Sequence, residues 1–361
     1  MLSPTSSLAR RGRIGRLLHA LTSPYFRYKH ANMIHAVRVA LGMATSFLVT
    51  TGIDVPHGVW ATVSLLVVVG GLQHYGNIRK KATERALGTM LGALIGLFLI
   101  LVQTLFGSQL LFFFLMSIIA GGCAYYAIGK AGYVALLTAI TMVIVSGHGD
   151  LPFSVGLWRT ANVLIGIAIA LAFSFVLPQY ATFSWRYRLA DNLRECSRLY
   201  GALLDGKHLL PEETARRFYA MSQRLVQSRA LMDSVAKETG VPLPQLEEIQ
   251  RLHRSILAAL EMLINSMPEA ENTYAIACTP REYEVRQQLL QMARALRFGR
   301  VTLLYRNVPA VACPPPEAAD TATQGMHWLA MRFAEQVERM RLRLAEIERQ
   351  WNIEGARPLS V

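Results

Sequence analysis

Three arginines stand in or beside long apolar stretches of this chain: Arg38, Arg85 and Arg159. A charged side chain is costly inside a membrane, so an arginine there either extends to the lipid head groups or belongs to a ligand pathway. A guanidinium binds a carboxylate through two parallel hydrogen bonds, which suits a small organic anion. Thr89, one turn after Arg85, can donate a further hydrogen bond, although helical threonines commonly bond to their own backbone. These four residues form the candidate substrate-binding set.

Arg38 and Arg159 also have purely structural interpretations. Arg38 lies about one turn inside its apolar stretch and can snorkel to the head groups. Arg159 can pair with Asp150 or with a lipid phosphate. If transport is driven by protons, His35 and Glu84 are the candidates for the relay. Proton pumps usually place an acidic relay mid-membrane, and the centres of the apolar stretches hold none, which favours a passive path.

Three glycines, Gly88, Gly92 and Gly96, repeat at four-residue intervals directly after a basic patch at residues 79–85. Lipid gives apolar helices no hydrophobic reason to associate, so small residues that let backbones approach hold such helices together. We therefore expect the three glycines to be helix-packing positions, within a bundle or across a dimer.

The length and spacing of the apolar runs predict six membrane spans, since a helix crosses a hydrocarbon core in about 20 residues. The expected spans lie near 33–51, 56–73, 85–104, 108–128, 133–147 and 157–177. Basic residues gather in the N-terminal segment 1–32 and in the loops at 74–84 and 129–132, which places all three in the cytoplasm of a bacterial inner membrane protein. Aromatic residues such as Tyr133 and Trp185 fit the inner interface.

The C-terminal half has an ordinary polar composition. Residues 1–177 hold 13 of the 37 Lys and Arg but 3 of the 24 Asp and Glu, so the remaining residues carry 24 basic and 21 acidic groups. Amphipathic periodicity predicts helices near 183–204, 212–239, 244–266, 280–305 and 319–352, with a proline-rich linker at 307–317. We expect an all-α protein: a six-helix transmembrane bundle at 33–178 followed by a cytoplasmic helical bundle at 179–361, with both termini cytoplasmic.

Several function classes lack residue support. No phosphate loop, nucleophile elbow or metalloprotease helix occurs, so we expect no enzyme activity and no cofactor. The basic excess lies in the apolar half rather than on a soluble face, which disfavours nucleic acid as a partner. His57 and His148 stand near acidic residues without the spacing of a metal site, and we expect no metal.

The run Arg85-Ala-Leu-Gly88-Thr89-Met-Leu-Gly92 resembles the R-x-x-G-T-x-x-G signature of the fusaric acid resistance and aromatic acid exporter (FUSC-like) inner membrane family. The sequences Leu157-Trp158-Arg159, Trp185-Arg186, Ala236-Lys237-Glu238-Thr239 and Met262-Leu263-Ile264-Asn265 resemble a single-unit branch of that family.

The resemblance implies a six-helix membrane unit with a cytoplasmic helical domain and efflux of aromatic carboxylic acids. Larger relatives carry the membrane unit twice, so a chain with one unit is expected to form a homodimer with its path on or near the two-fold axis. The plant aluminium-activated malate transporters, dimeric anion channels, have a similar plan. Two alternatives remain open at this stage: a passive anion channel, and a non-transporting scaffold whose cytoplasmic domain binds a partner. Membrane lipids are partners in every case.

Overall fold

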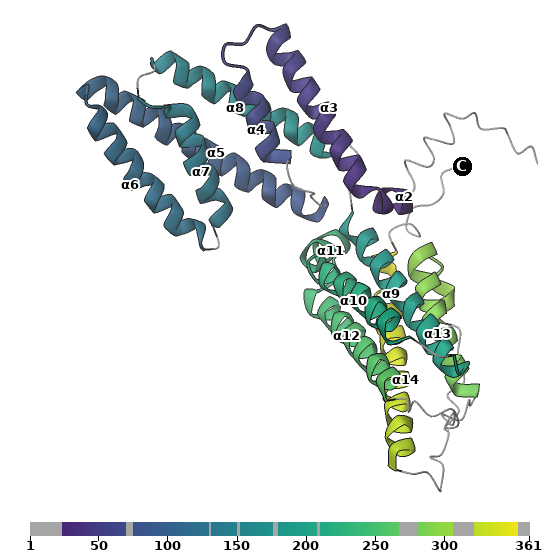
Figure 1. The fold of residues 1–361 in the computed structure, drawn as a ribbon. Coiled ribbons are helices and arrows are strands. Elements are labelled where there is room, and N and C mark those ends of the chain that lie inside the picture. The colour runs from purple at the N-terminus through teal and green to yellow at the C-terminus, as the bar shows by residue number, and fades with distance from the viewer. Residues whose placement is uncertain are drawn as a thin grey trace, which may run out of the picture. The chain divides into compact units, whose positions relative to one another are not determined.

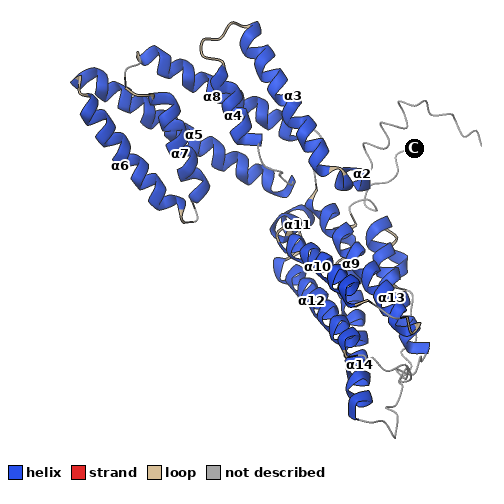
Figure 2. Cartoon of the chain, viewed as in Figure 1, coloured by secondary structure: helices blue, strands red, loops and turns tan. Residues whose placement is uncertain are grey.

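The computed structural model describes residues 24–69, 75–129, 131–149, 152–175, 180–207, 210–266, 280–305 and 321–352. Within these ranges every regular element is a helix (Figure 2), so the predicted all-α class is confirmed. The chain divides between Gln179 and Tyr180 into two compact units, here called the N-terminal and C-terminal units (Figure 1). Most of the basic N-terminal segment, Lys130, Asp150 and the linker at 307–317 lie outside the described residues.

Each of the six ranges that were expected to span the membrane overlaps one helix of the N-terminal unit. After the short α2 (Pro24–Lys29), these helices are α3 (Ala31–Gly52), α4 (Val59–Val69), α5 (Tyr75–Phe106), α6 (Gln109–Ala127), α7 (Gly132–Ser146) and α8 (Phe153–Phe175). By length and composition, α3, α5, α6 and α8 are long and apolar enough to cross a membrane. The apolar helices α4 and α7 have 11 and 15 residues and are shorter than a full crossing.

The N-terminal unit is built from two closely packed helix pairs, α5 with α7 and α4 with α8. Helix α3 packs on α4 and α8, and α6 packs on α7 and α5. Large apolar side chains point outward, as Leu48 on α3 and Leu110 on α6 show with exposed fractions of 73% and 82%. Buried positions are often small or polar, which is the pattern expected of helices surrounded by lipid.

The C-terminal unit is a helical bundle around one apolar core. Its elements are α9 (Ala181–Leu204), α10 (Pro211–Arg229), α11 (Met232–Thr239), α12 (Leu243–Asn265), α13 (Pro280–Phe298), the 3₁₀ turn η1 (Val301–Leu304), α14 (Thr321–Glu346) and α15 (Glu348–Trp351). The core draws on α9 to α15, and Leu260, Leu289 and Phe333 are fully buried in it. Trp185, expected at the membrane interface, is 1% exposed in this core, so that expectation was wrong.

Three helices expected in this unit end earlier than the periodicity predicted. The range 212–239 is divided because Leu231 N donates to Ser228 O rather than to the carbonyl four residues back, which closes a tight turn. The range 280–305 ends at Phe298 because Gly299 adopts a left-handed φ of 66°. The last helix is interrupted at Ile347 before α15.

The N-terminus of α9, the first helix of the C-terminal unit, is capped by a side chain from another helix, α11. The Glu238 carboxylate of α11 accepts hydrogen bonds from Ala181 N and Thr182 N, both at 2.9 Å, and from Thr182 Oγ1 at 2.8 Å. The first backbone N–H groups of a helix have no partner within it, and a negative charge there is favourable. Glu238 thus anchors the start of α9 to α11.

Candidate functional site

The candidate site with the clearest geometry lies where α5 meets α7. Arg85 on α5 is 6% exposed, and its guanidinium carbon lies 5.3 Å from the ring centroid of Tyr133 on α7. In the described part of the chain, Arg85 Nε and Nη1 have no hydrogen-bond acceptor, and the buried Tyr133 hydroxyl has no partner. A buried cation without a counter-charge is costly. The pair therefore offers several donors to an anion.

The three glycines of α5 allow α5 and α7 to approach closely, and this approach brings Arg85 and Tyr133 together. A Cβ at Gly88 would lie 2.7 Å from Val134 O, and one at Gly92 would lie 2.5 Å from Thr138 O. A Cβ at Gly96 would lie 2.9 Å from the Cβ of Val145. Only glycine permits the α7 backbone to approach α5 so closely, and Tyr133 stands one residue before the first of these contacts.

Threonines complete the α5–α7 contact. Thr138 Oγ1 donates to Val134 O at 2.9 Å and lies 3.2 Å from Gly88 O. Thr89 is buried one turn after Arg85, on the same side of α5. The contact between α5 and α7 therefore holds one cation beside a tyrosine, with two buried threonines nearby along the helices.

A second group of polar residues surrounds Arg159 on α8. Its Nη1 donates to Ile144 O of α7 at 3.0 Å, and its guanidinium carbon lies 5.3 Å from the ring centroid of Trp60 on α4. Three residues later, the fully buried Asn162 donates through Nδ2 to Pro56 O at 2.8 Å and to Trp158 O at 2.9 Å. Among the described residues, Asn162 Oδ1 accepts no hydrogen bond. Asp150, the partner considered for Arg159, lies outside them.

The remaining candidates lie on different helices. Arg38 is 8% exposed on α3, and His35 precedes it by about one turn. Glu84 is half-buried on α5. Helix α3 packs chiefly on α4 and α8, whereas α5 packs chiefly on α7 and α8. The structure thus brings Arg85 and Thr89 together. It places His35 on α3 and Glu84 on α5, and these two helices pack chiefly on different neighbours.

Tyr133 and Asn162 were not predicted as site residues. Asn162 had a signal in the sequence, because it is a polar residue in an apolar run, three positions after Arg159 and so on the same helix face. Tyr133 had none, since its expected interfacial position did not indicate a contact with Arg85.

Comparison with known protein families matches residues 32–356 to the Fusaric acid resistance protein family. The chain belongs to this family. The matched range includes helices of both units, so the predicted family resemblance is confirmed over residues 32–356.

Two curated proteins resemble this member of the fusaric acid resistance family. The Inner membrane protein YeeA of Escherichia coli is 26% identical over 328 residues, which cover 86% of this chain and 93% of YeeA. The Uncharacterized protein slr1298 of Synechocystis is 28% identical over 310 residues, which cover 82% of this chain and 38% of slr1298. The similarity to YeeA thus extends over nearly all of that protein, whereas slr1298 is much longer than the shared region.

In this family member, Asn192 is a buried polar residue of the C-terminal unit whose amide oxygen and nitrogen both have partners. Asn192 on α9 donates through Nδ2 to Met221 O at 2.9 Å and lies 3.0 Å from His253 Nε2, while its Oδ1 accepts from Arg224 at 3.1 Å. Because an amide nitrogen only donates, His253 must accept through Nε2 and is neutral. Burial lowers the pKa of His253 to about 3, in agreement with that role.

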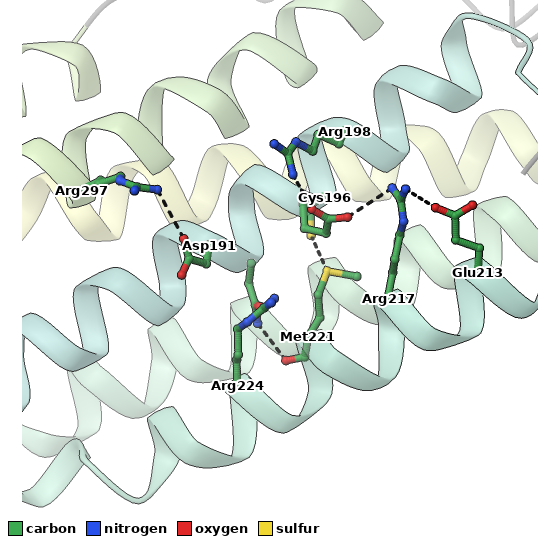
Figure 3. A network of polar contacts seen from close by, with 10 residues as sticks. Asp191, Cys196, Arg198, Glu213, Arg217, Met221, Arg224 and Arg297 are labelled. Atoms are coloured by element: carbon green, nitrogen blue, oxygen red, sulfur yellow. Dashed lines mark hydrogen bonds and ion pairs between the residues drawn. The ribbon is translucent and has the colours of Figure 1, made fainter. Parts of the chain in front are cut away.

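The same region of the C-terminal unit contains ion pairs and a buried thiol (Figure 3). Arg217 pairs with Glu195 at 3.2 Å and with Glu213 at 2.5 Å. Burial raises the pKa of Asp191, and the nearby Arg297, 3.7 Å away, partly opposes the rise. Burial raises the pKa of Cys196 to about 12, so this thiol is not a nucleophile at neutral pH. The geometry is that of a structural network.

Proposed function

We propose that this protein is a bacterial inner-membrane transporter that exports small organic anions such as aromatic carboxylic acids. The observation that carries the proposal is the buried Arg85 guanidinium, which faces Tyr133 with two donor nitrogens that find no acceptor in the described chain. Family membership supports a transport role, and the printed name of YeeA supports the inner membrane. Arg38, Thr89 and Arg159 are proposed as further substrate contacts.

The proposed architecture is six spans at 33–178, a basic cytoplasmic segment at 1–32 and a cytoplasmic domain at 179–361. At 1.5 Å per residue, the described part of α4 is about 16 Å long and α7 is about 22 Å long, less than a core of about 30 Å. A helix can end within a membrane where protein surrounds its end. Helices α4 and α7 are each packed along a longer partner, α8 and α5 respectively, and this packing supports their assignment as spans. With one such unit per chain, the proposed assembly is a homodimer.

A passive anion channel is the second candidate. In the described part of the N-terminal unit, the acidic residues are Asp54, in the loop after α3, and Glu84, in the basic first part of α5. A proton-driven exporter usually places an acidic relay deeper in the membrane. A scaffold that binds a cytoplasmic partner through the C-terminal unit is the third candidate, and it predicts no flux of any anion.

The decisive experiment uses the purified full-length protein in liposomes that contain trapped benzoate. Arg85→Gln should lower benzoate release at least tenfold, because it removes the buried cation but keeps a polar side chain of similar length. Arg27→Gln, on the short helix α2, is the matched control and should release benzoate like the unchanged protein. Equal release by Arg85→Gln, at equal amounts of folded protein, would refute the assignment of this residue.

The same liposomes separate the three candidate functions. Release that requires an imposed proton gradient identifies an exporter, and His35→Gln and Glu84→Gln then test the relay. Release that follows only voltage and concentration identifies a channel. If benzoate and other organic anions are all retained, transport is refuted and the search moves to proteins bound by the C-terminal unit.

A further inference from the structure

One exposed side of α10 repeats in the pattern of a coiled coil. From Glu212 to Arg229, alternating steps of three and four residues lead from one exposed position to the next. In order, these positions, here called the α10 stripe, are Glu212, Ala215, Tyr219, Ser222, Val226 and Arg229. Such steps keep side chains on one face of a helix, and in a coiled coil that face meets a second helix.

The α10 stripe is separate from the side chains that hold α10 within the C-terminal unit. Four buried residues form the core side of α10: Thr214, Phe218, Met221 and Ser228. On another side, Arg217 and Arg224 contact Glu195 and Asn192 of α9 (Figure 3). At 3.6 residues per turn, the stripe lies on neither of these sides.

The centre of the stripe is apolar and suits a second copy of itself. Tyr219 and Val226 have exposed fractions of 68% and 65%, and burial of such side chains is favourable in water. When two α10 helices lie antiparallel, Tyr219 of each copy can face Ser222 of the other, and Ala215 then faces Val226. Each of these layers joins a large side chain to a small one, as close packing requires.

The ends of the stripe carry opposite charges that fix the direction of the pair. In the same antiparallel register, Glu212 of each copy faces Arg229 of the other. A parallel pair would instead place like charges together at both ends, which is destabilising. Among the described residues, neither end of the stripe takes part in an ion pair, whereas the adjacent Glu213 does. Arg216, beside the stripe, would come near Gln223 of the second copy and meet no like charge.

We propose that the α10 stripe is a contact between two copies of this chain, in which α10 pairs antiparallel with α10 of the second copy. The inference goes beyond the proposed transport function and does not depend on it. A seam this short binds weakly in solution, but two chains in one membrane have a high effective concentration. They share a two-fold axis along the membrane normal, so the pairing places α10 across that normal.

Disulfide formation in the full-length protein in liposomes tests this register. The parent chain keeps the buried Cys196, and its other three cysteines are replaced by serine. Ala215→Cys and Val226→Cys together should give mostly covalent dimer on mild oxidation. Within one helix the two positions are about 16 Å apart and cannot bond to each other. Across the pair each faces the other, so either variant alone should give little dimer.

A matched control uses the same spacing outside the stripe. Arg216→Cys and Gln227→Cys, both at exposed positions, should together form dimer no faster than a single variant. The proposal is overturned if the control pair forms dimer as fast as the stripe pair. Rapid dimer formation by Val226→Cys alone also overturns it, because that result indicates a parallel pair.

Charge reversal in the stripe-pair variant gives a second test. Glu212→Arg or Arg229→Glu alone should slow dimer formation about fivefold at low salt, because each change places two like-charged pairs in the contact. Both reversals in one chain should restore the original rate. If they do not, Glu212 does not face Arg229 and the register is overturned. Benzoate release, measured on the same liposomes, decides the transport function separately.

Discussion

Among the described residues, the N-terminal unit leaves many more large apolar side chains exposed than the C-terminal unit does. Leu48 in the N-terminal unit is 73% exposed, whereas Leu260 in the C-terminal unit is completely buried. Hydrophobic burial is favourable in water and has no such value against lipid, where packing of small and polar groups holds helices together. Leucine is thus both buried, as Leu65 is, and exposed, as Leu48 is, in the N-terminal unit, whereas the C-terminal unit gathers its leucines mainly in one core.

One buried asparagine from each unit shows two ways in which a buried amide can be bonded. In the C-terminal unit, both ends of the Asn192 amide are bonded, to Met221 O and to Arg224. In the N-terminal unit, Asn162 Oδ1 and two nitrogens of Arg85 have no partner among the described residues. A satisfied network fixes a structure, whereas donors and acceptors left over are available to a ligand. Gln291 Oε1 and Asn352 Oδ1 in the C-terminal unit also accept no hydrogen bond from a described residue. What directs the search for a transport function to the N-terminal unit is therefore Arg85, a cation unpaired among the described residues, in a unit with helices long and apolar enough to cross a membrane.

The largest loss of stability is expected at the glycines of α5, where the backbones of α5 and α7 are in contact. Gly92→Leu would force a side chain against Thr138 O, 2.5 Å from the new Cβ, and should lower the free energy of unfolding by about 3 kcal/mol or more. Gly121→Leu on α6 is the control, because a Cβ there meets no atom within 4 Å. Thermal unfolding in detergent measures both variants. A stable Gly92→Leu variant would contradict the close α5–α7 contact.

The two buried asparagines allow a direct comparison of the units. Asn192→Ala leaves Met221 O and the Arg224 guanidinium without their partner and should cost about 2–3 kcal/mol of stability. Asn162→Ala removes a group that is only partly bonded and should cost about 1 kcal/mol, while it changes the rate of benzoate release. Urea unfolding and the liposome assay distinguish the two effects. The comparison fails if Asn162→Ala is the more destabilising change and leaves release unaltered.

Much of the fold could be predicted because its signals are local. Helices are present in the expected ranges, such as Gln109–Ala127 for the range 108–128, because length and hydropathy are read along one segment of chain. The breaks near Leu231 and Gly299 were missed. Apolar periodicity continues across both, and the backbone geometry that interrupts the helix is not part of that pattern.

The site was predictable only in part. Arg85 stood out as a cation beside an apolar run, and its motif carried the family resemblance, which is now confirmed. Tyr133 could not be found in the same way, since its relation to Arg85 depends on the close approach of α5 and α7. The partners of Asn162 are likewise set by tertiary packing, because Pro56 belongs to a distant segment. Residue type can be read from the sequence, whereas the presence or absence of a partner cannot.

The smallest expected effect, over the interval from pH 7.0 to 5.5, is an acid sensitivity of the C-terminal unit. Burial holds the pKa of His253 at about 3, against an ordinary value of 6.5. Below pH 6.5 the unfolded chain binds a proton that the folded chain does not, so stability falls as the pH decreases from 6.5 towards 3, by up to about 1.4 kcal/mol per pH unit. His253→Gln can still accept from Asn192 but does not titrate, and should lose this dependence. Hydrogen exchange of α9 and α12 at pH 7.0 and 5.5 measures the difference. An equal response in both proteins would mean that His253 is already protonated in the folded state, and that its bond to Asn192 is not the one described.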